Sequence, residues 1–342
     1  MELRELTSLV GVAGNEDEVR RAIMRELDSM GIPYETDFLG NIIAKKGTAG
    51  PKVLVDAHMD EVGLLISHIE KNGFIRFVSV GVPASVLPSK RILIGPNKVP
   101  GVIGAKAIHL QERRERETVI PVDQLYIDIG AKSREDAERK VKVGDYAVFD
   151  TQYEEISPGI IKAKALDDRV GCAILLDVLR EPWEKVQVYG VFATQEEVGL
   201  RGARVAANRV EPDMGIALEG TVCADIPGTE KEYQATRMGH GAALSFMDRG
   251  TIVHRGMLSH LLKTAKENDI PVQFREATSG GNDAGVIHQA KSGCPVASIS
   301  VPCRYIHTPF SLMSKRDYDA ALRLLILFLR SVEGGFRPCG IS

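Results

Sequence analysis

The chain has 342 residues, of which 44% are hydrophobic and 26% are charged, an ordinary composition for a folded protein in water. The formal net charge of −3 gives no electrostatic reason to expect nucleic acid or a membrane surface as a partner. The opening segment MELRELTSLV has no apolar core, and the apolar stretch 322–329 is too short to cross a bilayer. We therefore expect a cytoplasmic protein with one large domain and one smaller domain.

The chain contains five cysteines and no CxxC pair: Cys172, Cys223, Cys294, Cys303 and Cys339. In a cytosolic protein such residues are usually reduced thiols that pack as small hydrophobic side chains. Cys303 precedes His307 closely in the sequence, which leaves a Cys–His nucleophile open as an alternative. No third group that would orient the imidazole is evident.

The predicted elements begin with an alternation of helix and strand. Asn15 and Glu18 form a capping-box pattern, and the apolar residues after them predict a helix that ends at Gly31. Two strands are then predicted, at 41–45 and 52–56. Strand, polar loop, then helix is the order expected of an α/β protein with active groups at the carboxyl ends of its strands.

After residue 67 the pattern changes to short strands separated by glycine and proline. They are predicted at 74–80, 91–94, 99–103, 124–129 and 146–150, with one helix at 133–141 among them. This spacing is typical of a small β-barrel or β-sandwich. We predict that residues 68–159 form a β-rich domain inserted into the first one.

The α/β pattern returns at Asp168 and continues to the end of the chain. Helices are predicted at 169–179, 200–208, 256–268, 282–289 and 314–332, and strands at 186–194, 214–218, 272–274 and 296–301. The sequence thus predicts the α/β fold class. Its main domain would be discontinuous and consist of residues 1–67 and 160–342.

Histidine and carboxylate side chains gather where the predicted strands end. His58 and Asp60 follow the strand at 52–56, and residues two apart lie on one side of an extended chain. Asp60 could therefore accept a hydrogen bond from His58 and fix the tautomer that binds a metal ion. A surface histidine beside acidic residues is the alternative that this pair leaves open.

Asp167 and Asp168 directly precede a predicted helix. Only one of two adjacent carboxylates can point into a buried site, while the other is placed to cap the helix. We choose Asp167 as the carboxylate that bridges two cations. Capping remains the commonest role of an Asp pair at a helix start.

Glu196 and Glu197 follow an apolar strand, where two adjacent carboxylates are costly to bury without cations. One of them can ligate a metal ion while its neighbour acts as a general base. Glu219 ends another apolar strand, and His307 lies in an irregular segment that Pro309 prevents from being helical. Solvated acidic loops are the alternative to a metal site.

Two further segments have a less specific pattern. Gly280 and Gly281 form a turn before a predicted helix and are candidates for binding substrate, although a plain turn explains them equally well. His109 precedes the charged segment 111–118, whose alternating signs are typical of a solvated loop.

In chain order the motifs resemble one known family. His-x-Asp, Leu-Asp-Asp-Arg, Glu-Glu-Val-Gly-Leu-Arg-Gly-Ala, a strand-end acid and Tyr-Ile-His-Thr-Pro are similar to motifs of the tetrahedral, or TET-type, dinuclear aminopeptidases. Several members are called glutamyl aminopeptidases, and some carry an endoglucanase label. The resemblance covers nearly the whole chain, including the inserted β-rich domain. It implies a mixed-sheet αβα metallopeptidase domain that removes N-terminal residues from short peptides.

The resemblance also implies a role for each matching residue. The implied metal ligands are His58, Asp167, Glu197, Glu219 and His307, and the implied catalytic residues are Glu196 as general base and Asp60 as the group that orients His58. Asp167 would bridge two divalent ions per subunit, zinc or cobalt. The family implies a homo-oligomer, a dodecamer built from dimers through the inserted domain. Asp is more frequent than Glu at position 219 in the family, so metal preference or occupancy could differ here.

Three other functions remain open at this point. A binuclear amidohydrolase that deacylates N-acyl amino acids would use the same metal ligands. A glycosidase needs two carboxylates and no metal, which would leave His58 and His307 without a role, and Trp183 is the only tryptophan that could stack on a sugar. A non-catalytic scaffold would not need the ligand set.

Overall fold

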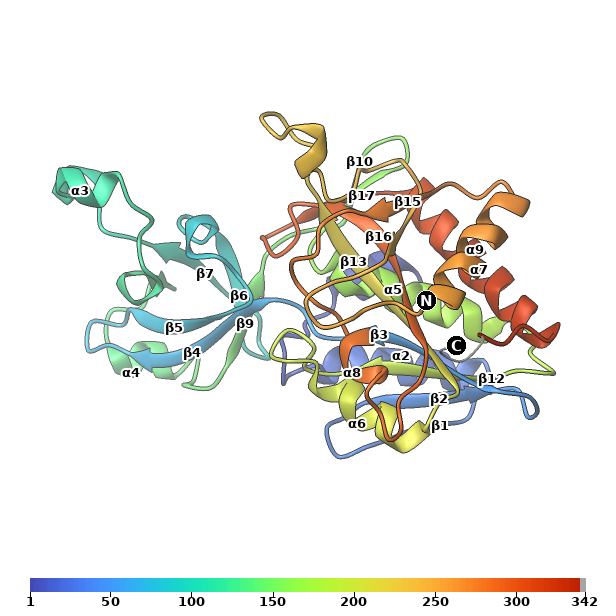
Figure 1. The fold of residues 1–342 in the computed structure, drawn as a ribbon. Helices are drawn as coiled ribbons and strands as arrows, with labels where there is room; N and C mark the ends of the chain where they lie inside the picture. The colour runs from blue at the N-terminus through green and yellow to red at the C-terminus, as the bar shows by residue number, and fades with distance from the viewer. Residues whose placement is uncertain (339–342) are drawn as a thin grey trace.

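The computed structural model describes residues 1–338 and is built on an 11-stranded mixed sheet. Its strands are β1 Tyr34–Thr36, β2 Ile42–Lys46, β3 Lys52–His58, β10 Glu154–Ser157, β11 Ile160–Ala163, β12 Gln187–Ala193, β13 Met214–Cys223, β14 Ala242–Ser245, β15 Val272–Arg275, β16 Val296–Arg304 and β17 Ser311–Ser314. The main path runs β1-β2-β12-β3-β13-β16-β17-β11-β10, and β14 joins β15 to β16. A separate β-barrel projects from one side of this body (Figure 1).

The four central strands run parallel to one another. β3 pairs with β12 and with β13, and β13 pairs with β16. Their carboxyl ends therefore meet at one edge of the sheet, which is where open α/β sheets bind ligands. Ala193 is the register partner of His58, so the segment after β12 starts beside the end of β3.

Helices cover both faces of the sheet. They are α1 Leu3–Ser8, α2 Asp17–Ser29, α5 Leu166–Arg180, α6 Arg201–Val210, α7 Arg255–Glu267, α8 Ala284–Ile287 and α9 Lys315–Glu333. Val53 and Val55 of β3 belong to the core that α2, α5, α7 and α9 cover, whereas Leu54 packs with α6 and α8 on the other face. This αβα arrangement confirms the predicted α/β fold class.

The barrel has its own strands and its own core. Its strands are β4 Gly63–Ile69, β5 Ile75–Val80, β6 Arg91–Ile94, β7 Val99–Gly104, β8 Tyr126–Asp128 and β9 Tyr146–Phe149, and they close in the order β4-β5-β8-β7-β6-β9. Ile66, Ile75 and Ile127 are buried at its centre. Two short helices accompany it, α3 Arg113–Arg116 at the tip of a long arm and α4 Arg134–Glu138 (Figure 1). The barrel sheet begins at Gly63, before the predicted domain boundary at residue 68.

Four single 3-10 turns complete the secondary structure of the described residues: η1 Ala84–Val86, η2 Ile108–Leu110, η3 Val122–Gln124 and η4 Lys231–Tyr233. Between residues 1 and 338, no helix has both the length and the apolar composition needed to cross a bilayer.

Some local predictions fail for physical reasons. No side chain caps α2, and the Glu18 carboxylate accepts a hydrogen bond from the Val10 N–H (3.2 Å), so the capping box of Asn15 and Glu18 is wrong. Strands β1, β4, β10, β11, β14 and β17 were not predicted. All of them except β4 have only three or four residues, too few to show a clear periodicity. Cys339 lies outside the described residues.

Two phenylalanines differ in burial, so their replacement should change the stability of the protein by different amounts. Phe328 of α9 is fully buried, whereas Phe38 is fully exposed. Phe328→Ala should lower the free energy of unfolding by about 3–5 kcal/mol, because it removes packed apolar surface and leaves a cavity. Phe38→Ala should change it by less than about 0.5 kcal/mol. Urea unfolding of the two variants checks this, and equal losses would contradict the assigned core.

Candidate metal centre and active site

His58 is the last residue of β3 and is buried. Its Nε2 atom lies 3.6 Å from Asp167 Oδ1 and 3.7 Å from Glu219 Oε2. Its Nδ1 atom lies 3.1 Å from the backbone carbonyl oxygen of Asp60. When Nδ1–H donates to this carbonyl, Nε2 keeps a free lone pair that faces the carboxylates, as a metal-binding imidazole requires.

The carboxylate of Asp60 holds the turn that carries the two glutamates. Its Oδ1 accepts a hydrogen bond from the Glu196 N–H (2.9 Å) and its Oδ2 accepts one from the Glu197 N–H (3.0 Å). The distance from Oδ1 to His58 Nδ1 is 3.6 Å, longer than that of the Asp60 carbonyl. Asp60 thus contacts His58 mainly through its backbone, and its side chain fixes the glutamate pair.

Asp167 lies between the two histidines. Its Oδ1 faces His58, and its Oδ2 lies 3.5 Å from His307 Nε2. The Gly220 N–H donates to Oδ1 at 3.2 Å. A Cβ atom at position 220 would lie 2.9 Å from the Cα and Cβ atoms of Asp167, so glycine is needed for this close approach.

Asp168 has a structural role. It is fully buried; its Oδ1 accepts a hydrogen bond from the Gly171 N–H (3.0 Å) and its Oδ2 accepts one from the His58 N–H (3.2 Å). The bond to a backbone donor three residues ahead is that of a helix N-cap. The geometry therefore gives Asp168 the capping position and leaves Asp167 facing the histidines.

His307 lies in the loop between β16 and β17 and has a φ of 59°. Its Nε2 atom lies 3.5 Å from Glu197 Oε1 and 3.5 Å from Asp167 Oδ2. At the start of this loop the Arg304 guanidinium forms two hydrogen bonds of 2.7 Å with the Asp225 carboxylate. The chain therefore brings His307 to Asp167 from the carboxyl end of the fourth parallel strand.

Burial dominates the electrostatics of the glutamates. It raises the pKa of Glu196 and Glu219 well above their usual range and that of Glu197 to about 7. Burial would raise the pKa of Asp167 too, but its contacts with His307 and His58 outweigh that effect and lower it. Several carboxyls packed this closely are stabilised by added positive charge.

Two groups of side chains have the donors and spacing that divalent cations require. His58, Asp167 and Glu219 form one group and Asp167, Glu197 and His307 the other, with ligand atoms in each group within 4.8 Å of one another. His58 Nε2, Glu197 Oε1 and Glu219 Oε1 are buried without a hydrogen-bond partner among residues 1–338. Such atoms are costly to bury, and a bound cation would satisfy all three. The donor set therefore fits divalent metal ions.

The remaining predicted site residues belong to neither of these two groups. Gly280 and Gly281 are in an exposed loop beside Arg275. Cys303 is buried in the core, where burial raises the pKa of its thiol well above the usual range and disfavours a Cys–His nucleophile. His109 is exposed and lies in η2, between β7 and α3 in the sequence.

A buried ionic network that the sequence did not indicate ties the ligand segments together. Lys164 donates to both carboxylate oxygens of Glu61, at 2.8 and 2.9 Å. Arg169 donates to the Met59 carbonyl (3.0 Å) and to Glu61 (3.3 Å). These bonds fasten the turn of Asp167 to the segment after β3. Glu61 and Arg169 adjoin the recognisable motifs, but no sequence signal marks a buried lysine.

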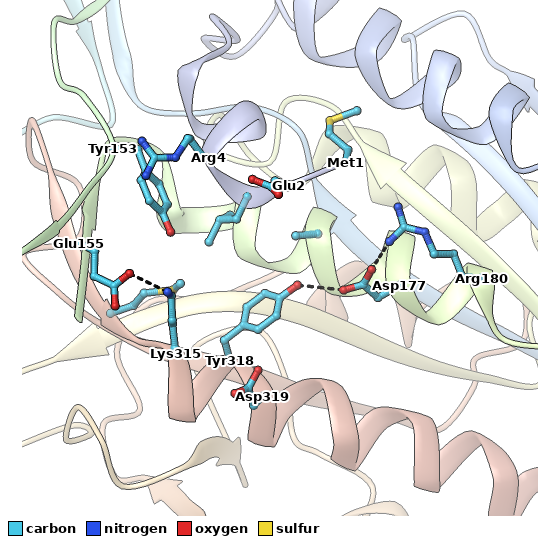
Figure 2. Close-up of a pocket in the computed structure, with 13 residues that line it drawn as sticks. Met1, Glu2, Arg4, Tyr153, Glu155, Asp177, Arg180, Lys315, Tyr318 and Asp319 are labelled. Carbon is cyan, nitrogen blue, oxygen red and sulfur yellow. Dashed lines mark hydrogen bonds and ion pairs between the residues drawn. The ribbon is translucent and has the colours of Figure 1, made fainter. Parts of the chain in front are cut away.

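A separate cavity of about 660 Å³ lies between the N-terminal segment, α5 and the start of α9 (Figure 2). Its wall contains the Lys315–Glu155 ion pair (2.8 Å) and the Tyr318 hydroxyl, which donates to Asp177 (3.3 Å). The lining includes none of the candidate ligands or catalytic residues. This cavity is therefore distinct from the metal centre.

Comparisons with known proteins identify the family. A profile of the M42 glutamyl aminopeptidase family matches residues 40–324. The chain belongs to this family. The glutamyl aminopeptidase of Lactococcus lactis is 32% identical to it over 344 residues, which cover 97% of this chain and 96% of that protein. As an M42 peptidase, the protein is a metal-dependent aminopeptidase that hydrolyses peptide bonds.

Solved structures agree with the M42 assignment. The TET aminopeptidase of a marine sediment archaeon of the Thaumarchaeota superposes with a TM-score of 0.93 at 34% identity, over 97% of each chain. The TET1 peptidase of Pyrococcus horikoshii superposes with a TM-score of 0.85 at 31% identity, over 96% of this chain and 98% of that one. That peptidase is described as assembling into a tetrahedron or a large octahedral shell.

Glu16 holds the backbone of the glutamate turn, and its buried carboxyl makes the stability of the protein depend on pH. Its buried Oε1 accepts hydrogen bonds from the Gly14 N–H (2.7 Å) and the Gln195 N–H (3.1 Å). Burial raises its pKa to about 7 from an ordinary 4.5, so the folded protein holds the Glu16 proton more tightly than the unfolded chain does. This group therefore favours folding below about pH 4.5, and that contribution is lost as pH rises through 7.

Glu16→Gln keeps an acceptor for both N–H groups and removes the titration. The free energy of unfolding of the variant minus that of the wild type should rise between pH 4.5 and pH 8, by at most about 3 kcal/mol. Thermal unfolding of both proteins across this range measures the difference. A stability difference that stays constant with pH would contradict the assigned effect of Glu16 burial.

Proposed function

We propose that the chain is a dinuclear aminopeptidase that removes the first residue of short peptides. The proposal depends most on one observation: the two carboxylate oxygens of Asp167 face two different histidines, each accompanied by its own glutamate. His58 and Glu219 would hold one cation, His307 and Glu197 the other, and Asp167 both. The longer arm of Glu219 still reaches His58 Nε2 to within 3.7 Å, which supports a ligand role despite the more usual Asp.

Two bound cations would polarise the scissile carbonyl and make an attacking water more acidic. Glu196 is placed to act as the general base, because its Oε2 lies 3.9 Å from His58 Nε2 and its N–H is held by Asp60. Its carboxylate takes a proton from the attacking water and returns it to the departing amine.

The environment of the centre favours a peptide with a free N-terminus. Acidic side chains from the segment after β12 and from β13 surround it, and a protonated α-amino group would be attracted to them. An N-acyl amino acid lacks that positive charge, so an amidohydrolase that acts on such substrates is the second candidate function. We expect zinc or cobalt, because imidazole and carboxylate donors suit both ions.

We further propose that residues 68–159, which contain most of the barrel, act as an inserted assembly domain, and that the protein forms a dimer-based dodecamer. The barrel has a core separate from that of the main sheet, so it can mediate contacts without disturbing the metal centre. The reported assembly of the TET1 peptidase supports this proposal. We expect the assembly to work in the cytoplasm, with peptides rather than nucleic acid or membranes as partners.

Glu196→Gln tests the assigned base. The variant should bind the same number of metal ions as the wild type, because Glu196 belongs to neither ligand group, and should lose turnover by at least about 10². Metal content by elemental analysis and hydrolysis of aminoacyl p-nitroanilides give the two readouts. Glu267→Gln, at an exposed position of α7, is the matched control and should keep full turnover.

Substrate choice separates the candidate functions in the same assay. The wild type is assayed with aminoacyl p-nitroanilides, with N-acyl amino acids and with carboxymethylcellulose. Each substrate is tested before chelation, after chelation and after zinc or cobalt is restored. Retained turnover of Glu196→Gln would refute the base assignment. Faster hydrolysis of N-acyl amino acids would favour the amidohydrolase, and cellulose hydrolysis that survives chelation would favour a glycosidase.

A further inference from the structure

His307 reaches the metal centre from a loop whose backbone needs support. Tyr305 has a φ of 62° and His307 a φ of 59°, which places both in the left-handed region that non-glycine residues rarely adopt. Such a conformation persists only where surrounding contacts hold it. The Thr308 hydroxyl lies 2.7 Å from the Tyr305 carbonyl oxygen and 2.8 Å from that of Phe310, and it can donate to either. These contacts lie inside the loop, so they maintain its shape but not its position against the sheet.

An ion pair fixes the position at which the loop begins. Arg304 is the last residue of β16 and directly precedes Tyr305. Its Nε–H donates to Asp225 Oδ1 and its Nη2–H donates to Asp225 Oδ2, both at 2.7 Å. Two parallel contacts fix the orientation of a guanidinium as well as its distance, which a single contact does not. Arg304 is thereby held in one orientation at the residue from which the loop departs.

Asp225 is itself held by its surroundings. It lies two residues beyond Cys223, which ends β13 and is the register partner of Arg304. The Cys223 thiol donates to Oδ1 at 2.8 Å, and the Met238 N–H donates to Oδ2 at 3.2 Å. Burial would raise the pKa of the Asp225 carboxyl, but its contact with Arg304 outweighs that effect and lowers it. The pair is therefore fully ionised at neutral pH and is attached to the end of β13.

We propose that the Arg304–Asp225 ion pair is a positioning device that holds the His307 imidazole where it can bind the cation shared with Glu197. This inference rests on the proposed dinuclear centre. Without the ion pair the loop would sample other positions, and His307 would be placed correctly in only a fraction of the molecules. The apparent affinity for this cation would fall in proportion to that fraction.

The effect should be confined to one of the two cations. His58 ends β3 and Glu219 lies in β13, so these ligands of the other cation come from strands of the sheet. Their positions depend on the pairing of β3 with β13 and not on the loop after β16. A loss confined to the His307 cation therefore distinguishes a positioning role from a general loss of stability.

The test is a calorimetric titration of the metal-free protein with zinc, which measures each binding step without using catalysis. The wild type should bind two ions per chain. Arg304→Met should weaken one step by about 10–100-fold, the range found when a group that orients a metal ligand is removed. The other step should stay within about twofold of the wild type, which also shows that the variant is folded. Arg304→Lys should weaken the same step by a smaller factor, because an ammonium group keeps the charge but not the paired contact.

A histidine variant assigns the steps to the two cations. His307→Ala removes an imidazole ligand, so the step that it abolishes should be the one that Arg304→Met weakens. In the double variant the remaining step should equal that of His307→Ala alone, since Arg304 acts only through His307.

Arg209→Met is the matched control. Arg209 of α6 makes the same paired contact with Glu35, at 2.6 and 2.7 Å, and both side chains are exposed. Both zinc-binding steps of this variant should equal those of the wild type.

Three results would overturn the proposal: wild-type affinity at both steps in Arg304→Met, equal weakening of both steps in that variant, or the same loss in Arg209→Met. A wild type that binds fewer than two zinc ions per chain would refute the proposed dinuclear centre itself. That result is distinguishable from two intact steps that do not respond to Arg304→Met.

Discussion

The two carboxylate oxygens of Asp167 face two different imidazoles, that of His58 at 3.6 Å and that of His307 at 3.5 Å. The histidines come from segments about 250 residues apart, one at the end of β3 and the other just beyond β16. They meet because β3, β13 and β16 run parallel and end at the same edge of the sheet. The fold can thus be understood as a support that holds one carboxylate between two histidines.

Burying the glutamates beside Asp167 costs electrostatic free energy, which nearby positive charge must offset. Burial raises the pKa of Glu196, Glu197 and Glu219, so these carboxyls are stable as anions only beside positive charge. Lys164 offsets Glu61 instead of these three residues. Two divalent cations at the shared carboxylate would supply the missing charge and satisfy the unpaired buried atoms. The same physical requirement therefore accounts for the ligand set and the metal dependence of the family.

Much of the fold could be predicted from the sequence, because the spacing of its apolar residues matches the faces that the structure buries. Apolar runs such as 186–194 predicted the parallel strands, and the acids beside them predicted candidate ligands that the structure brings together. The prediction that Glu219 ends its strand was wrong, because β13 continues to Cys223 and Glu219 lies inside it. The support for these ligands could not be predicted, since it depends on contacts between distant segments. The Asp60 carboxylate holds the glutamate turn through the N–H groups of Glu196 and Glu197, and this contact has no local sequence signal.

The most direct test of the account is a crystal structure of the zinc-loaded protein, with ion positions taken from anomalous diffraction at the zinc edge. The account predicts two ions per chain, each contacting one oxygen of Asp167. One should also contact His58 and Glu219, and the other His307 and Glu197. A single ion per chain, or two ions that do not share Asp167, would contradict the dinuclear centre.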